Sequence, residues 1–256
     1  MSAGSPSAAE VLRYYVEELR RRLGDKLVKV ILFGSYARGV ADEHSDIDAL
    51  VVHRGDENEV RALVADATLE TCLKCNAPLE PITMGVHEFR SESPFVKEVE
   101  KSGVVLYSVD PEEEVLGLAA DYLPLIEEYL SYARECLEKG RYRLAVDLGY
   151  NAAELAVRAL VLLKGETLAR THGGLAAQFA RLYVGSGEVE REVGRALHEA
   201  LMLRSRARYD PRAVVGREEA EKVVKLAERL LDILKKKIET TSTKTSTAHE
   251  PAGGSQ

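Results

Sequence analysis

Two kinds of hydrophobic pattern divide the chain. In the first 110 residues, short apolar runs of strand length alternate with stretches whose apolar residues recur at helical spacing. We expect strands at 27–33, 47–52, 79–84 and 104–108. We expect helices at 9–23, 57–74 and 95–101. Strands interleaved with helices predict an α/β or α+β layer structure.

Beyond Pro111 the pattern changes, and no strand signal is left. Helices are expected at 112–139, 142–164, 174–183, 188–208 and 217–238. Short connections rich in Gly and Pro separate them, which predicts an all-α helical bundle. The expected domains are therefore 1–110 and 111–240. The tail 241–256, TSTKTSTAHEPAGGSQ, has almost nothing to bury and is expected to be disordered.

Composition and charge narrow the class of protein. Hydrophobic residues make up 45% of the chain and charged residues 30%, which is typical of globular proteins. The net charge of -7 speaks against a protein that coats nucleic acid non-specifically, although a local basic patch is compatible with it. No apolar run approaches the ~20 residues of a membrane span, and the N-terminus lacks a signal-peptide pattern. We therefore expect a cytoplasmic protein with no membrane partner.

The chain has three cysteines, too few for a disulfide scaffold. Cys72 and Cys75 form a C-x-x-C, the spacing of many metal and redox sites. The stretch around them has a helical pattern, and no second C-x-x-C or His pair lies nearby. We therefore interpret them as two small apolar residues on a helix.

The stretch FGSYARGVADEHSDIDALVV, residues 33–52, joins two predicted strands. Gly34 directly follows an apolar strand and can take backbone angles that other residues avoid. The free N–H groups after it and the Ser35 hydroxyl suit the phosphates of a nucleotide. Asp46 and Asp48 lie two residues apart on the next strand, so their carboxylates share a face and repel each other. A bridging Mg²⁺ would relieve that repulsion, because Mg²⁺ takes hard oxygen ligands and binds phosphates.

Further candidates lie around this motif. A third carboxylate would let two metal ions hold the attacking and leaving oxygens, and Glu80, early in the next predicted strand, is best placed for it. Arg38 lies one turn beyond Ser35, and it either reaches a phosphate or is an ordinary exposed arginine. His44 and His53 flank the Asp-x-Asp strand without a partner at metal-ligand spacing, so we expect both at the surface.

A strand, a Gly-Ser pair, a ten-residue spacer and Asp-x-Asp resemble the minimal nucleotidyltransferase family of the DNA polymerase β-like superfamily, over about residues 27–108. The resemblance implies a small mixed sheet with flanking helices. It implies transfer of a nucleoside monophosphate from an NTP, for which we expect ATP, to a hydroxyl acceptor with the help of Mg²⁺ or Mn²⁺. The third acid of the family is often Asp, whereas this chain has Glu80 followed by Pro81. The implied catalytic and metal-binding residues are Asp46, Asp48 and Glu80, and the nucleotide-binding residues are Gly34, Ser35 and Arg38.

The helical half resembles a HEPN domain over about residues 112–238. The resemblance is carried by a Y-N-A-A-E run, an H-G-G-L turn that begins at His172, and an Arg- and Tyr-rich cluster near Arg204. HEPN ribonucleases use an Arg followed four to six residues later by a His that transfers protons. Here Tyr209 stands near the place of that His, so RNA cleavage is disfavoured. His172 itself, beside two glycines, is expected to be a turn or helix-start residue.

The cluster around Arg204, Arg208 and Tyr209 has two interpretations. It is a solvated helix end that complements the helix dipole, or it contacts the phosphates of a nucleotide or an RNA. The resemblance also implies that minimal nucleotidyltransferases of toxin–antitoxin pairs modify a HEPN tyrosine. Tyr209 is then a candidate acceptor, with arginines beside it to neutralise the incoming phosphate.

Three classes of function follow, and the third, a HEPN-type ribonuclease, is disfavoured by the absence of the motif His. In the first, the chain is a metal-dependent nucleotidyltransferase whose HEPN-like domain binds or presents nucleotide, RNA or a protein acceptor. In the second, it is a regulatory nucleotide- or RNA-binding protein of toxin–antitoxin type with weak or no transferase activity. A protein tyrosine, a small molecule and an RNA end all offer a hydroxyl, so the acceptor stays open. The large apolar helices are also compatible with a homodimer through the helical domain.

Overall fold

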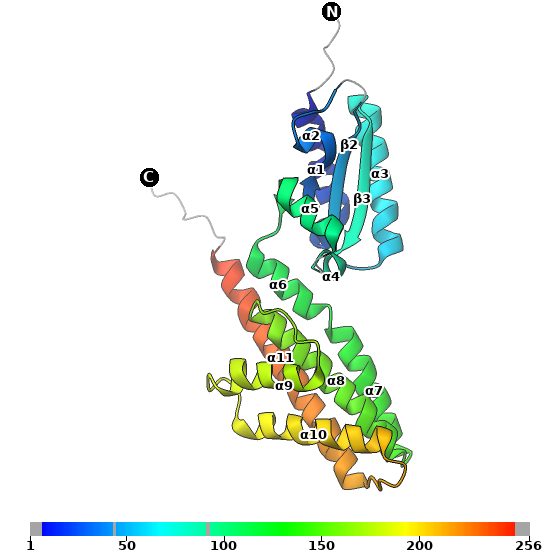
Figure 1. The fold of residues 1–256 in the computed structure, drawn as a ribbon, viewed down its shortest axis with the longest axis vertical. Coiled ribbons are helices and arrows are strands. Elements are labelled where there is room, and N and C mark those ends of the chain that lie inside the picture. Colours follow the sequence, from blue (N-terminus) through cyan, green and yellow to red (C-terminus); the bar gives the residue numbers. More distant parts are fainter. Residues whose placement is uncertain (1–6, 43–44, 91–92, 249–256) are drawn as a thin grey trace, which may run out of the picture. The chain divides into compact units, whose positions relative to one another are not determined.

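The computed structural model describes residues 7–42, 45–90 and 93–248, with side chains up to residue 243. Two compact units make up the chain, Met1–Asp110 and Pro111–Gln256 (Figure 1). Each has a hydrophobic core of its own. Within the described residues, no helix is both long and apolar enough to cross a membrane.

The first unit is built on a four-stranded sheet with the order β3-β2-β1-β4. The strands are β1 (Leu27–Leu32), β2 (Ile47–His53), β3 (Leu79–Gly85) and β4 (Val104–Ser108). β1 pairs antiparallel with both β2 and β4, whereas β2 and β3 are parallel. The sheet is therefore mixed, which confirms the predicted fold class of this half.

Two long helices, α1 (Ala8–Leu23) and α3 (Glu57–Cys75), cover one face of the sheet (Figure 1). Their apolar residues form one core with alternate residues of β1 and β2, as the two-residue period of a strand requires. The short helices are η1 (Gly24–Lys26), α2 (Gly34–Ala37), α4 (Val86–Phe89) and α5 (Pro94–Ser102). Phe89 of α4 and Val99 of α5 line a small hollow with Ile31, so these two helices lie on the opposite face.

The two cysteines of the C-x-x-C lie near the end of α3 as free thiols. Cys75 is buried in the core of the first unit, and Cys72 packs against that core. The interpretation of both as apolar helix residues is therefore confirmed.

The second unit is entirely helical in its described residues, which confirms the predicted bundle. Its helices are α6 (Pro111–Ala120), α7 (Leu123–Glu138), α8 (Tyr142–Leu163), α9 (His172–Phe179), η2 (Ala180–Val184), α10 (Arg191–Tyr209) and α11 (Arg217–Ala248). α8 is the central helix, since α6, α7, α9, α10 and α11 all pack against it. The expected single helix over 112–139 is in fact two. Pro124 is the reason, because proline suits the first turn of α7 but not a helix interior.

The last helix is longer than predicted. Where the sequence predicted a disordered tail from residue 241, α11 continues to Ala248. The hydroxyl groups of Thr240 to Thr243 each donate a hydrogen bond to the carbonyl oxygen four residues earlier, so these polar side chains fold back on the helix. Residues 249–256 of the predicted tail lie outside the described residues.

Candidate functional site

The turn after β1 is built around Gly34. Its φ angle is +72°, in the left-handed region that side chains disfavour. A Cβ atom at this position would lie only 1.9 Å from Oδ2 of Asp48. The N–H of Phe33 donates to the carbonyl oxygen of Asp48 at 3.0 Å, which extends the β1–β2 pairing to this point. Glycine is therefore required here because the backbone passes directly against the Asp48 carboxylate.

Three carboxylates lie along one edge of the same sheet face. Asp48 is directly opposite Glu80 in the parallel β2–β3 pair, and Asp46 precedes the first residue of β2. Residues two apart on a strand share a face, as do paired residues on neighbouring strands. Asp48 is half-buried, whereas Asp46 and Glu80 are exposed. Within the described residues, none of the three forms an ion pair. Asp48 and Glu80 are thus neighbours, Asp46 lies two residues before Asp48, and none of these charges is paired within the described residues.

These residues fit a divalent cation. The donors are all carboxylate oxygens, the ligands that Mg²⁺ prefers. Because residue 34 is a glycine, no Cβ atom at this position blocks the Asp48 carboxylate. In the part of the chain that the structure describes, no three Asp, Glu, His or Cys side chains converge as a complete metal site. Mg²⁺ usually keeps water and substrate oxygens among its ligands, so two carboxylates suffice on the protein side.

Ser35 and Arg38 belong to the short helix α2 and its end. Ser35 is half-buried, and its carbonyl oxygen accepts a hydrogen bond from the N–H of Val40 at 3.1 Å. Arg38 follows the helix and is exposed, as both interpretations of this arginine require.

His53 is not at the surface, so that prediction was wrong. It is 1% exposed at the end of β2, and its Nε2 lies 2.9 Å from Oε2 of Glu57. The other carboxylate oxygen of Glu57 accepts a hydrogen bond from Thr83 at 3.0 Å. His53 is buried because α3 begins directly over the end of β2, and it joins that helix to the sheet. His44 lies outside the described residues.

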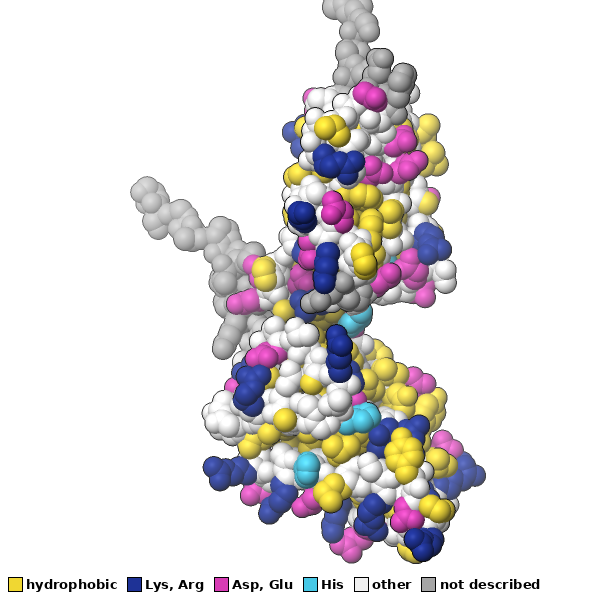
Figure 2. Space-filling model, viewed as in Figure 1, with side chains coloured by type: hydrophobic (Ala, Val, Ile, Leu, Met, Phe, Trp, Pro, Cys, Tyr) yellow, Lys and Arg dark blue, Asp and Glu magenta, His cyan; other side chains and the backbone are white. Residues whose placement is uncertain are grey.

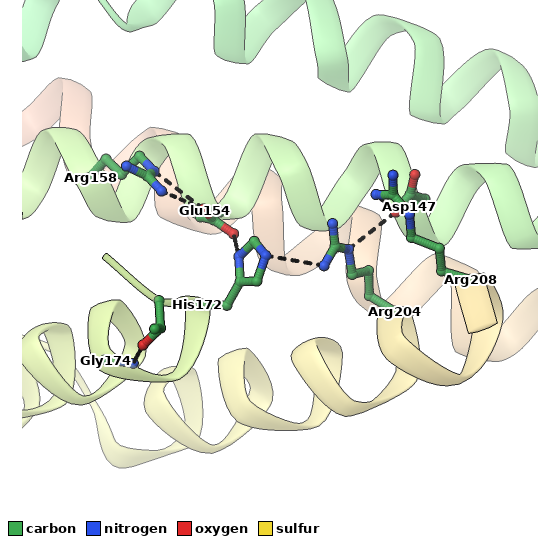
Figure 3. A network of polar contacts seen from close by, with 8 residues as sticks. Asp147, Glu154, Arg158, His172, Gly174, Arg204 and Arg208 are labelled. Carbon is green, nitrogen blue, oxygen red and sulfur yellow. Dashed lines mark hydrogen bonds and ion pairs between the residues drawn. The ribbon is translucent and has the colours of Figure 1, made fainter. Parts of the chain in front are cut away.

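A chain of polar contacts links α8, α9 and α10 in the second unit (Figure 3). Arg158 donates to Oε1 of Glu154 at 2.9 Å, and Oε2 of Glu154 contacts Nδ1 of His172. Nε2 of His172 lies 3.3 Å from a terminal nitrogen of Arg204. Nε of Arg204 donates to Asp147 at 3.2 Å. His172 is the first residue of α9, as the helix-start expectation predicted, and it is also held between a carboxylate and a guanidinium.

Two members of this network are buried, whereas the His172 side chain is 46% exposed. Arg204 is 7% exposed and Glu154 9%. The Arg204 guanidinium lies 5.5 Å from the ring centroid of Tyr150, and the His172 ring meets the same tyrosine edge-on at 6.0 Å. Burial beside Glu154 raises the pKa of the Tyr150 hydroxyl, which therefore stays protonated. Arg204 is thus an internal anchor of α10, and its contact with a phosphate stays a prediction.

Tyr209, by contrast, is 71% exposed at the last residue of α10. The Arg208 guanidinium lies 5.9 Å from its ring centroid. Arg143 donates to the carbonyl oxygens of Ala207 at 3.1 Å and Asp210 at 2.8 Å, which closes the end of the helix around the tyrosine. The phenol group of Tyr209 is accessible, and the backbone on either side of this residue is held by Arg143.

The sequence analysis did not identify the residues that α8 contributes to the network. Asp147, Glu154 and Arg158 recur at intervals of seven and four along α8, so they face one side of an otherwise apolar helix. That spacing was the available signal. The position of His172 opposite this side depends on how α9 packs, which the helical pattern does not encode.

Two family models match the chain. Residues 12–142, which are 131 of the 256 residues, match the nucleotidyltransferase domain, and residues 127–238 match the HEPN domain. The chain therefore belongs to the nucleotidyltransferase domain family and carries a HEPN domain after it. The predicted fusion is confirmed.

Three relatives come from Methanocaldococcus jannaschii. One, provisionally named a protein adenylyltransferase, is 36% identical over 78 residues, 28% of this chain and 51% of the relative. Another with the same provisional name is 33% identical over 96 residues, 37% of this chain and 94% of the relative. A third, provisionally named a toxin, is 32% identical over 131 residues, 51% of this chain and 93% of the relative. The chain thus spans about half the length of the first relative and almost all of the other two.

Proposed function

We propose that the first unit transfers a nucleoside monophosphate from an NTP, with ATP as the expected donor, to a hydroxyl group. The observation that carries this proposal is the row of unpaired carboxylates beside Gly34 on one face of the sheet. Membership of the nucleotidyltransferase domain family supports the class of reaction.

Each residue of the site has a proposed role. Asp46 and Asp48, with Glu80 on the next strand, hold the divalent cation, which when bound neutralises charge on the triphosphate. The Ser35 hydroxyl donates a hydrogen bond to a phosphate oxygen, and Arg38 adds positive charge at the same end of β1. The acceptor oxygen forms a bond to the α-phosphorus, the bond to pyrophosphate breaks, and Glu80 takes the proton of the acceptor hydroxyl.

The acceptor that we propose is the Tyr209 phenol of the helical unit. Its exposure, the guanidinium of Arg208 beside its ring and the anchored end of α10 support this choice. The provisional names of the relatives, two protein adenylyltransferases and a toxin, are compatible with a protein acceptor in a toxin–antitoxin setting. A homodimer through the helical unit stays a prediction, which light scattering on the purified chain tests.

Intact mass spectrometry after incubation with ATP and Mg²⁺ tests the proposal. We expect a mass increase of one adenylyl group that disappears in Tyr209→Phe. Tyr132→Phe is the matched control, because Tyr132 is also exposed but donates its hydroxyl hydrogen to Glu128 at 2.9 Å, which raises the pKa of this phenol. An increase that persists in Tyr209→Phe rejects this acceptor. No transfer to any protein, RNA or small hydroxyl acceptor rejects the activity.

One observation favours a second function, RNA cleavage by the helical unit. We infer that His172 of α9 takes the place of the histidine that α10 lacks, because it lies beside Arg204 and contacts Glu154. A carboxylate-held imidazole is a suitable proton-transfer group. Cleavage of RNA in EDTA that is lost in His172→Asn would establish this function. Cleavage that is absent from the wild-type chain, or unchanged in the variant, would reject it.

A further inference from the structure

Two aromatic rings meet beside the carboxylate row, by which we mean Asp46, Asp48 and Glu80. Phe33, the residue before Gly34, and Phe95, on the first turn of α5, pack edge to face with ring centroids 5.6 Å apart and an interplanar angle of 89°. Ser93 caps α5 by accepting the N–H of Val96 at 3.2 Å, and Pro94 begins the helix. Phe95 is thereby held in place, yet its side chain and backbone are together 37% exposed.

The strand register connects these rings to the site. Leu32 is paired with Ala49, and the N–H of Phe33 donates to the carbonyl oxygen of Asp48, so Phe33 lies opposite Asp48. Opposite residues on neighbouring strands share a face. One row across the sheet therefore runs from Phe33 through Asp48 to Glu80, with Phe95 packed on its first member.

The same face carries further exposed apolar surface. Ile82, two residues after Glu80 on β3, is partly exposed. Figure 2 shows hydrophobic side chains gathered on the first unit between α5 and β3. The carboxylates thus have an aromatic pair on the β1 side and an aliphatic side chain on the β3 side.

We propose that Phe95, supported by Phe33, contacts the base of the bound nucleotide. This assignment rests on the proposed nucleotidyl transfer and adds the contact that holds the nucleoside. The turn proposed to bind phosphate, at Gly34, follows Phe33 directly, so the ring pair lies next to the proposed place of the triphosphate. Stacking on an aromatic ring is tolerant of the base but stronger for larger π-surfaces, so purine nucleotides should bind more tightly than pyrimidine nucleotides.

A tryptophan reporter tests the contact directly. The chain contains no Trp, so Phe95→Trp has a single indole at the proposed contact. With Mg²⁺ present, ATP should quench and shift its fluorescence, whereas tripolyphosphate, which has no base, should leave the emission nearly unchanged. Equal responses to both compounds would overturn the assignment.

Calorimetric titration of the full chain measures the contribution of the ring. Phe95→Ala should weaken ATP binding about tenfold and leave tripolyphosphate binding unchanged. Leu73→Ala is the matched control, since Leu73 is 74% exposed on α3, which covers the opposite face of the sheet. Unchanged ATP affinity in Phe95→Ala would overturn the base contact. Failure of the wild-type chain to bind either compound would overturn the nucleotide site itself, which is a different result.

Discussion

The two units differ in whether their clustered charged side chains have partners within the protein. In the first unit, Asp46, Asp48 and Glu80 lie together without an ion pair among the described residues. In the second, Glu154 and Arg204 are buried, and each contacts His172. Like charges placed side by side raise the free energy of the folded state, and buried charges do so unless they have partners. These charges of the second unit have such partners within the protein, whereas the three carboxylates of the first unit have none among the described residues.

The difference indicates where a ligand is needed. The network of the second unit pairs its charges with one another and connects α8, α9 and α10, so these charges have partners whether or not anything binds. In the proposed function, Asp46, Asp48 and Glu80 gain partners when a cation and a phosphate bind. Substitutions in the two places should therefore separate activity from stability.

The largest effect is expected at the carboxylate row. Asp46→Asn combined with Asp48→Asn should reduce Mg²⁺-dependent transfer by at least about a thousandfold, because the cation loses its protein ligands. Without metal the free energy of unfolding should stay level or rise, since a repulsion is removed. Transfer from labelled ATP and urea unfolding measure both quantities. Asp66→Asn on α3 is the control, and undiminished transfer by the double variant would contradict the site.

The reverse outcome is expected for the buried network. Arg204→Met should lower the free energy of unfolding by about 3 kcal/mol, because it removes one partner of a buried set of charges. Transfer to an added acceptor should be unaffected per folded molecule. Urea unfolding compares this variant with Arg195→Met, an exposed position on the same helix. Equal stability of the two variants would show that the network does not stabilise the bundle.

Gly34→Ala should lower both the stability of the first unit and its transfer activity. The added Cβ atom meets the Asp48 carboxylate and forces a left-handed φ on alanine, so we expect a loss of about 2 kcal/mol together with reduced transfer. Gly39→Ala is a close control, since Gly39 has a φ of +70° but no atom within 4 Å of the place that an added Cβ atom would take. If both variants behave alike, the contact with Asp48 is unimportant.

A smaller effect on the free energy of unfolding is expected from the protonation of Glu188. Hydrogen bonds from Lys164 and Lys237 lower the pKa of this carboxyl from 4.5 to about 2. A lowered folded-state pKa means that the stabilisation is complete above pH 4.5 and is lost as the pH falls towards 2. After allowance for solvent screening, Glu188→Gln should lower the free energy of unfolding by about 1 kcal/mol at neutral pH. Unfolding curves of the two proteins should converge near pH 2, and a constant difference would contradict the pKa.

The smallest effect is expected from separating the units. Fragments 1–110 and 111–256 should each fold, because each contains a complete hydrophobic core. Circular dichroism should show cooperative thermal unfolding of both. Two unfolded fragments would mean that the domain assignment is wrong.

Most of the first unit could be predicted because its signals are local. Apolar runs of strand length and helical spacing predicted the four strands and the helices α1 and α3. Two features were not predicted because they depend on how helices pack: His53 is buried under the start of α3, and Arg204 is buried against Tyr150. A third lies in the tail, where serine and threonine hydroxyl groups bond to the helix instead of to water.

The sequence by itself determined the Gly34 turn and the shared face of Asp46 and Asp48, because a positive φ and a two-residue strand period are properties of a few adjacent residues. Only the tertiary structure decided which distant residues join them. Parallel pairing of β2 and β3 brings Glu80 opposite Asp48, and α5 brings Phe95 onto Phe33. In the bundle, the packing of α9 against α8 and α10 brings His172 to Arg204, 32 residues away. These contacts depend on register and helix packing, which are set by the burial of whole faces and not by any local pattern.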